Sequence, residues 1–137
     1  MAIQARSMGM AQRRVEDPRL LRGRATYLED LRPPGLLHAA FVRSPHGHAR
    51  VLRVDVVPAL ASPGVRLALA AAELGLFVQP LSTRISTPGC RQVDRPHLAG
   101  DRVRFVGEPV ALVVADDVYL ARDAAELVQV AYDPLPA

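Results

Sequence analysis

The chain has 137 residues, half of them apolar, which is enough to bury the core of one domain of ordinary size. Its seventeen basic residues are all arginine and give a formal charge of +3; they are scattered and accompany few aromatic residues, which argues against a nucleic-acid-binding protein. The single cysteine, Cys90, excludes an internal disulfide and a metal site built from several cysteines.

The beginning of the chain predicts short local elements. Residues 1–15 show no periodicity, so we expect a flexible leader followed by one domain over residues 16–137. Asp17 and Pro18 are suited to the N-cap and first position of a short helix. The Pro-Pro-Gly segment within residues 31–35 predicts a turn.

Alternating short strands and helical turns follow. Residues 36–42 form an apolar run between two proline-containing turns and predict a buried strand, whereas the alternation in residues 50–56 predicts a half-exposed strand. The next elements are predicted as a short helix over 57–62, a strand over 65–69 and a helical turn over 70–74. Residues 75–100 show no clear period, so we expect either a functional loop or a segment that packs against something outside this sequence.

The last part of the chain has the strongest pattern. Residues 110–115 are all apolar and predict a buried strand, after which Asp116 and Asp117 supply an N-cap. Residues 128–132 alternate and predict a final strand. The helix between the two strands is expected to pack through Leu120, Ala124, Leu127 and Val128. A strand-helix-strand unit of this length predicts parallel strands with a right-handed crossover, and the fold class is mixed α/β.

Histidine supplies the first candidate site. His46 and His48 are two residues apart, which places both side chains on one face of a strand. They could bind zinc together with other donors, namely His38, His97 or Cys90. Paired cysteines and a nearby carboxylate triad are missing, so we favour a turn after Ser44 in which the histidines bond to the backbone.

Two further side chains have a catalytic and a structural interpretation. Glu108 precedes the buried strand and could act as a general base, but a Glu in a Gly-Glu-Pro turn more often bonds to nearby N–H groups. Cys90 could be a nucleophile with a pKa lowered by Arg91, although no His–Asp pair accompanies it. Glycine-rich phosphate loops are absent from the sequence. We therefore predict no catalytic, cofactor-binding or metal-binding residue.

Several ordered segments resemble a known family. They are RLLRGRATYLED at 19–30, PGLLHAAFVRSPH at 34–46, FVGEPVA at 105–111, YLA at 119–121, DAAELV at 123–128 and YDPLP at 132–136. Together they resemble the opening of the large subunits of xanthine dehydrogenase, aldehyde oxidase and aerobic carbon monoxide dehydrogenase, which are molybdenum hydroxylases. The resemblance implies an α/β hammerhead domain. Residues 66–77 fit the pattern loosely, and the loop after them does not align.

The resemblance implies an N-terminal structural or assembly domain of a molybdopterin-dependent oxidoreductase. In the family, molybdopterin and the catalytic glutamate belong to later domains, so we expect this chain alone to be inactive and without cofactor. The implied partners are the molybdopterin-binding domains and, through them, iron–sulfur and FAD subunits, with neither nucleic acid nor membrane. We expect a fragment, whether a cloned domain, a split gene or a truncated reading frame.

Two alternatives stay open at this point. The chain could be a free-standing, non-catalytic interaction module that reuses the hammerhead fold, or an independent metal enzyme that uses His46 and His48. The sequence shows no signal peptide and no apolar run of the roughly 20 residues that span a membrane, so we expect a cytoplasmic protein.

Overall fold

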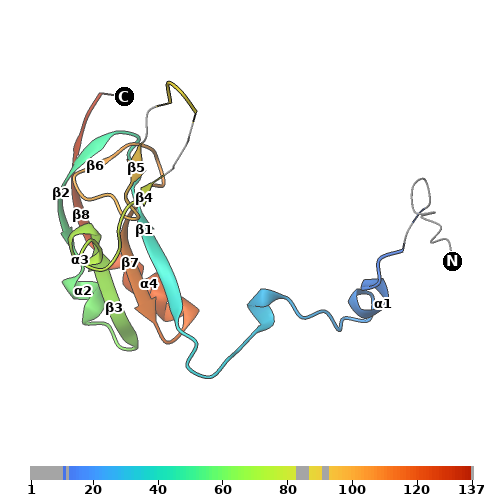
Figure 1. Cartoon of the computed structure of the whole chain (residues 1–137). Coiled ribbons are helices and arrows are strands. Elements are labelled where there is room, and N and C mark those ends of the chain that lie inside the picture. The colour runs from blue at the N-terminus through green and yellow to red at the C-terminus, as the bar shows by residue number, and fades with distance from the viewer. Residues whose placement is uncertain (1–10, 12, 83–86, 91–92, 137) are drawn as a thin grey trace. The chain divides into compact units, whose positions relative to one another are not determined.

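The computed structural model describes residue 11 and residues 13–82, 87–90 and 93–136 (Figure 1). It divides the chain into two compact units, Met1–Pro34 and Gly35–Ala137. Most of the predicted leader, namely residues 1–10 and residue 12, lies outside the described residues. In the part of the chain that is described, the elements comprise four α-helices, one 3-10 helix and eight strands.

The N-terminal unit contains α1 (Asp17–Leu20) and the 3-10 helix η1 (Leu28–Asp30). The predicted N-cap is wrong by one residue: Glu16 holds that position and Asp17 is already helical. The reason is that the Glu16 carbonyl accepts the first helical hydrogen bond, from Leu20 N–H at 3.0 Å. The helix ends at Leu20 with Leu21 as its C-cap, and Gly23, two residues later, has a positive φ of 64°, a conformation that favours glycine.

The C-terminal unit consists mainly of two three-stranded sheets, with strand orders β1-β7-β3 and β6-β2-β8. A two-stranded ribbon, β4-β5, accompanies them. The elements are β1 (His38–Arg43), β2 (Ala49–Asp55), α2 (Val57–Leu60), β3 (Val65–Ala70), α3 (Ala71–Leu74), β4 (Leu81–Ser82), β5 (Asp94–Arg95), β6 (Arg102–Val103), β7 (Pro109–Ala115), α4 (Val118–Glu126) and β8 (Gln129–Pro134). The predicted mixed α/β class is confirmed.

Strand β7 is the centre of its sheet, as the apolar run at 110–115 predicts. It pairs antiparallel with β1 on one side and with β3 on the other. Most of its residues are buried. The β1 strand is confirmed, but the prediction that it is buried is wrong. It forms an edge of the sheet, and its residues alternate between partial burial and exposure, with Phe41 about half exposed.

The predicted parallel crossover at the end of the chain is wrong. After α4 the chain enters the other sheet, where β8 pairs antiparallel with β2, from Ala49 opposite Pro134 to Asp55 opposite Gln129. Every strand pair within the described residues is antiparallel. The physical reason is that β8 alternates apolar and polar residues, which suits a strand with one face on the core rather than a strand covered on both faces.

Helix α4 begins as predicted, and its predicted packing face is confirmed at Ala124 and Val128 but is wrong at Leu120 and Leu127. The Asp117 carboxylate accepts a hydrogen bond from Tyr119 N–H at 2.7 Å, which confirms the N-cap. Ala121 and Ala124 are buried, whereas Leu120 and Leu127 of the predicted face are exposed. Small side chains allow the helix to approach the sheet closely, and this places the two leucines at the edges of the contact.

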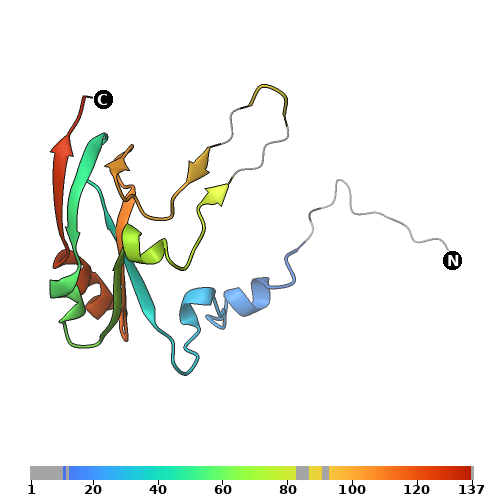
Figure 2. The same ribbon diagram turned by 60° about the vertical axis from the view of Figure 1, so that its left-hand side comes forward.

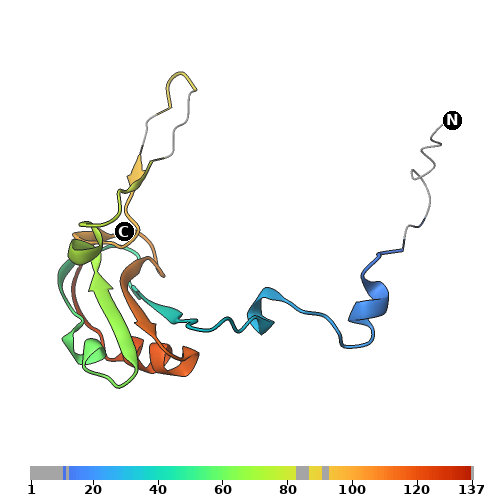
Figure 3. The ribbon, with the colours of Figure 1, turned by 60° about the horizontal axis from the view of Figure 1, so that its bottom comes forward.

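The core joins the two sheets and the helices. One buried cluster combines β7, β3, α2 and α4, and partly buried valines of the second sheet pack against it; its buried members are Ala59, Ala68, Ala111, Val113, Ala124 and Val128. Helices α2 and α4 lie at the same end of the unit (Figure 3). A second cluster consists of Ala49, Ala99, Val103 and Val110. The core thus contains alanine and valine and few bulky residues.

The predicted long loop contains the β4-β5 ribbon, which projects away from the two sheets (Figure 2). Each strand of the ribbon has only two residues, and all four are exposed. Leu76 and Phe77, which precede the ribbon, are also largely exposed. Residues 83–86 and 91–92 lie outside the described part of this segment.

Candidate functional site

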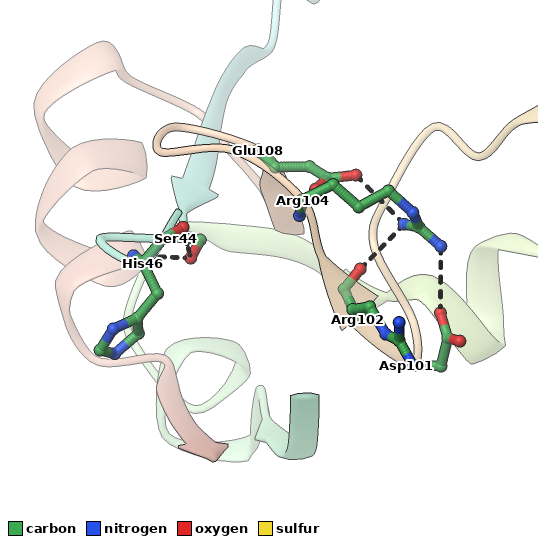
Figure 4. Close-up of polar contacts among 6 residues, drawn as sticks. All are labelled: Ser44, His46, Asp101, Arg102, Arg104 and Glu108. Carbon is green, nitrogen blue, oxygen red and sulfur yellow. Dashed lines mark hydrogen bonds and ion pairs between the residues drawn. The ribbon is translucent and has the colours of Figure 1, made fainter. Parts of the chain in front are cut away.

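The sequence candidates His46 and Glu108 meet where two loops are linked to each other. We call this region the loop junction; it consists of residues 44–48 between β1 and β2 and residues 104–108 between β6 and β7 (Figure 4). Ser44 N–H donates to the Glu108 carbonyl at 2.9 Å, and Gly107 N–H donates to the Ser44 carbonyl at 2.8 Å. Gly107 has a φ of +89°, which a side chain would strain.

Ser44 organises the first loop from a buried position. Its hydroxyl oxygen accepts a hydrogen bond from His46 N–H at 3.0 Å and lies 3.2 Å from the His46 carbonyl oxygen, to which it can donate. This is the local turn that serine forms with the backbone two residues later. The contact directs the chain out of β1 and around Pro45. It also fixes the backbone from which the His46 ring extends.

Glu108 stabilises the second loop through contacts between its carboxylate and Arg104. The side chain is buried, and one carboxylate oxygen accepts a hydrogen bond from Arg104 N–H at 2.5 Å. The other oxygen lies 3.5 Å from the Arg104 guanidinium, which in turn lies 3.6 Å from Asp101. The same guanidinium donates to the Arg102 carbonyl at 2.9 Å. Both oxygens of Glu108 therefore contact one arginine, in the way expected of a turn residue.

The two histidines of the motif have different environments. The His46 ring contacts the Tyr132 ring edge to face, with 4.9 Å between ring centroids. Nδ1 of His48 lies 2.6 Å from the Pro136 carbonyl oxygen, so this ring holds the C-terminal segment to the loop. The backbone contact expected for the histidines is present for His48, whereas the His46 ring contacts another ring.

The hydroxyl of Tyr132 has a shifted pKa. Burial raises the pKa of Tyr132 above its ordinary value of 10.0, and the nearby Ser44 hydroxyl partly offsets this rise. The Tyr132 hydroxyl oxygen is itself buried and makes no hydrogen bond of standard geometry within the described residues. The side chain is thus suited to remain a neutral phenol that packs against His46.

The other candidate ligands are dispersed. His38 lies on β1, and Nε2 of His97 lies 3.1 Å from the Gln79 carbonyl oxygen. Cys90 is exposed, and its neighbour Arg91 lies outside the described residues. Within residues that the structure describes, no three His, Cys, Asp or Glu side chains are grouped closely enough to hold a metal ion.

A cleft of about 600 Å³ lies between the ribbon and the second loop. Its walls combine apolar and charged side chains. They include Leu81, Val93 and Phe105 on the apolar side, and Asp94, Arg95, His97, Arg104 and Glu108 on the polar side. The buried acid of this cleft is Glu108, whose carboxylate is paired with Arg104. The arrangement shapes a surface but does not present a free acid, base or nucleophile in a buried position.

Sequence reasoning missed the importance of three residues at this site. Ser44 was identified only as the residue before a turn, although a serine two residues before a turn N–H is a local signal. Tyr132 gave no signal, because its contact with His46 depends on how the sheets bring distant segments together. Arg104 was missed although it lies only four residues before Glu108 in the same loop.

Comparison with known families gives a match over most of the chain. Residues 22–136 match the family described as "Aldehyde oxidase and xanthine dehydrogenase, a/b hammerhead domain". The chain is 44% identical over 115 residues to the nicotine 6-hydroxylase large subunit of Paenarthrobacter nicotinovorans, covering 84% of this chain and 14% of that protein. It is 43% identical over 129 residues to the carbon monoxide dehydrogenase large chain of Afipia carboxidovorans, covering 94% and 15%.

Solved structures give the same result. Quinoline 2-oxidoreductase from Pseudomonas putida 86 matches with a TM-score of 0.88 and 44% identity, over 94% of this chain and 16% of that one. A Cu,Mo-CO dehydrogenase matches with a TM-score of 0.77 and 41% identity. The chain therefore spans about one sixth of the length of these relatives. No helix in the described residues is long and apolar enough to cross a membrane.

Proposed function

Because the chain belongs to the a/b hammerhead domain family of aldehyde oxidase and xanthine dehydrogenase, we propose that it is the structural domain of a molybdenum hydroxylase large subunit. Its part is to support assembly, and catalysis belongs to domains outside this sequence. The observation that carries the proposal is the pairing of the Glu108 carboxylate with Arg104 at the loop junction. Glu108, the best-placed candidate base, uses both carboxylate oxygens on Arg104 and stabilises a turn.

The side chains present do not fit a molybdenum cofactor. The buried carboxylate of Glu108 is already paired with Arg104. His46 contacts a ring, and His48 and His97 contact backbone carbonyls. Among the described residues, no three His, Cys, Asp or Glu side chains are grouped closely enough to hold a metal ion. We therefore place the cofactor outside this chain. Elemental analysis of the purified chain should find no stoichiometric molybdenum or iron, and a stoichiometric amount that survives gel filtration would contradict this.

Exposed apolar residues indicate where neighbouring domains would pack. Leu76 and Phe77 are largely exposed, and a ribbon with two residues in each strand is too short to be stable by its own pairing. Burial of such residues on another domain would give the ribbon the support it lacks. On this proposal the molybdopterin-binding domains cover this surface, and the iron–sulfur and FAD subunits are reached through them.

A chimera tests the assembly role. Residues 22–136 would replace the matching part of quinoline 2-oxidoreductase, which is 44% identical. The chimera should assemble and keep kcat within about tenfold, a barrier change near 1.4 kcal/mol. Glu108→Gln in the chimera should lower the melting temperature without changing kcat further, and exposed Asp133→Asn is the matched control.

The opposite pattern would refute the proposal. A fully assembled Glu108→Gln chimera whose kcat falls about a hundredfold, while Asp133→Asn does not, would make Glu108 part of the catalytic machinery, since general acid–base groups contribute about 10²–10⁴-fold. His46→Ala serves as a second variant. The proposal expects it to leave kcat unchanged because the His46 ring packs against the ring of Tyr132.

A further inference from the structure

Residues 134–136 offer the sheet few backbone donors. Pro134 is the last residue of β8, opposite Ala49 of β2, and Pro136 follows two positions later. Proline has no N–H group and holds φ at about −65°, so neither residue can donate to the ladder. Leu135 precedes a proline and is therefore restricted to extended backbone. A segment this stiff has a defined direction once its backbone is held at two points.

His48 holds this segment at two points. The His48 carbonyl accepts a hydrogen bond from Leu135 N–H at 2.9 Å, and Nδ1 of the His48 ring lies 2.6 Å from the Pro136 carbonyl oxygen. The backbone of one residue thus satisfies the only N–H group of the segment, and its side chain reaches a carbonyl one residue further on. The two residues joined by the ring are 88 positions apart in the sequence.

The loop that carries His48 is itself held in place. The His46 ring contacts Tyr132 of β8, so the same loop also touches the strand just before the segment. At its other end, Ser44 is joined to residues 104–108 by the two backbone hydrogen bonds of the loop junction. The direction of residues 134–136 is therefore tied to the loop junction through His48.

The Pro136 contact decides which nitrogen of the His48 ring carries the proton. A carbonyl oxygen only accepts hydrogen bonds, so Nδ1 must be the donor. In a neutral imidazole this leaves Nε2 without a proton. His97 has the opposite arrangement, since its Nε2 lies 3.1 Å from the Gln79 carbonyl oxygen. The two histidines are therefore expected to be opposite tautomers.

We propose that His48 is a positioning residue that fixes the direction of residues 134–136 relative to the loop junction, through the Nδ1-protonated form of its ring. The inference rests on the proposed function, because a fixed direction matters when further domains pack on this one. It deepens that function by naming the contact that sets how the chain continues from β8. It also gives the second histidine of the His46-Gly47-His48 motif a role that needs no metal ion.

Nitrogen NMR of the histidine rings tests the tautomer. At about pH 9 imidazole is neutral, and long-range ¹H–¹⁵N spectra of the chain should show the proton of His48 on Nδ1. The same spectrum should show the proton of His97 on Nε2, which makes His97 an internal control. A His48 ring that carries its proton on Nε2 would overturn the proposal, because it could not donate to Pro136.

Three substitutions of His48 test the anchor. Asparagine carries an N–H group at the δ position and can replace Nδ1, whereas glutamine carries it at the ε position and alanine has none. His48→Ala and His48→Gln should each speed hydrogen exchange of Leu135 N–H about fivefold, or about 1 kcal/mol at 1.4 kcal/mol per tenfold. His48→Asn should stay within about twofold of the parent, and so should the control His97→Ala. Equal exchange in the parent and the His48→Ala variant would refute the anchor.

Folding of the variants is checked by thermal melting. His48 belongs to neither core cluster, so the variants should stay folded. If His48→Ala does unfold, the tautomer and the comparison of His48→Asn with His48→Gln still decide. Equal exchange in those two variants would then overturn the proposal.

Assembly tests the consequence for neighbouring domains. In the chimera with quinoline 2-oxidoreductase, His48→Ala should lower the assembled fraction recovered from gel filtration at least about threefold, and His48→Asn should restore it. A parent chimera that does not assemble would contradict the proposed function, and the exchange data would then decide the role of His48. A chimera that assembles equally well with His48→Ala would overturn the positioning role and leave the proposed function intact.

Discussion

Val113 offers the most direct test of the core. It is fully buried in the middle of β7 and belongs to the cluster that joins both sheets with α2 and α4. Val113→Ala removes two carbon atoms, which costs about 1.6 kcal/mol at roughly 0.8 kcal/mol per buried methylene. The cavity that remains adds a further cost, so we expect a loss of about 2–3 kcal/mol.

This loss is large for a domain of this size. A unit of about 100 residues has a total stability of about 5–15 kcal/mol, and each kilocalorie lowers the melting temperature by about 4–8 °C. Val113→Ala should therefore melt about 10–20 °C below the parent protein. Val113→Asp buries a carboxylate without a partner, which costs several kcal/mol more, and should prevent cooperative folding.

Urea denaturation followed by circular dichroism measures the loss. The control is Val106→Ala, at a site that is 68% exposed, where we expect a change within about 0.5 kcal/mol. Equal midpoints for the Val113→Ala and Val106→Ala variants would refute the assignment of β7 as the core strand. A cooperative melt of the Val113→Asp variant near the parent temperature would refute it more strongly.

Three further substitutions test local contacts. Glu108→Ala leaves the Arg104 N–H without its acceptor and should cost about 1–3 kcal/mol in thermal unfolding, whereas Glu108→Gln, which keeps an acceptor, should cost less. Gly64→Ala forces a φ of +79° on a residue with a side chain and should cost about 1–2 kcal/mol; Gly47→Ala, where φ is not in that region, should cost less. Asp117→Ala removes the N-cap of α4 and should cost about 1 kcal/mol, and an unchanged urea midpoint would contradict the cap.

Local signals in the sequence predicted much of the fold. The apolar run at 110–115 marked the central strand because a strand covered on both faces needs no polar positions. The short helix predicted over 57–62 is present as α2, although it ends two residues earlier, at Leu60. The N-cap Asp117 was predictable because its contact spans only two residues. Each of these signals depends on neighbours in the sequence.

Contacts between distant segments, and one contact within a turn, were not predictable in the same way. The pairing of β8 with β2 depends on which sheet has a free edge. The alternation in residues 129–134 favours a strand with one covered face but does not identify its partner strand. On α4, the leucines had the stronger apolar signal, but close approach to the sheet selected the alanines. At the loop junction, Glu108 was identified as a candidate, yet its partner Arg104 was not, because a turn has no period that pairs two side chains.

Tyr132 allows a prediction about alkaline pH. Burial raises the pKa of its hydroxyl above 10.0, so the folded protein holds this proton more tightly than the unfolded chain. Below about pH 10 the phenol is neutral in both the folded and the unfolded state, so Tyr132 contributes no pH dependence to the free energy of unfolding. As the pH rises above 10, the unfolded chain ionises first and unfolding becomes more favourable. Tyr132→Phe should abolish this part of the alkaline loss.

Melting temperatures between pH 8 and pH 11 measure the effect, with Tyr119→Phe as the control because Tyr119 is largely exposed. At neutral pH, Tyr132→Phe should be neutral or stabilising, since the hydroxyl that it removes is buried without a standard hydrogen bond within the described residues. Parallel alkaline profiles for the parent and the Tyr132→Phe variant would show that the phenol ionises as easily in the folded state as in the unfolded chain. The packing against His46 would then not shield its hydroxyl from water.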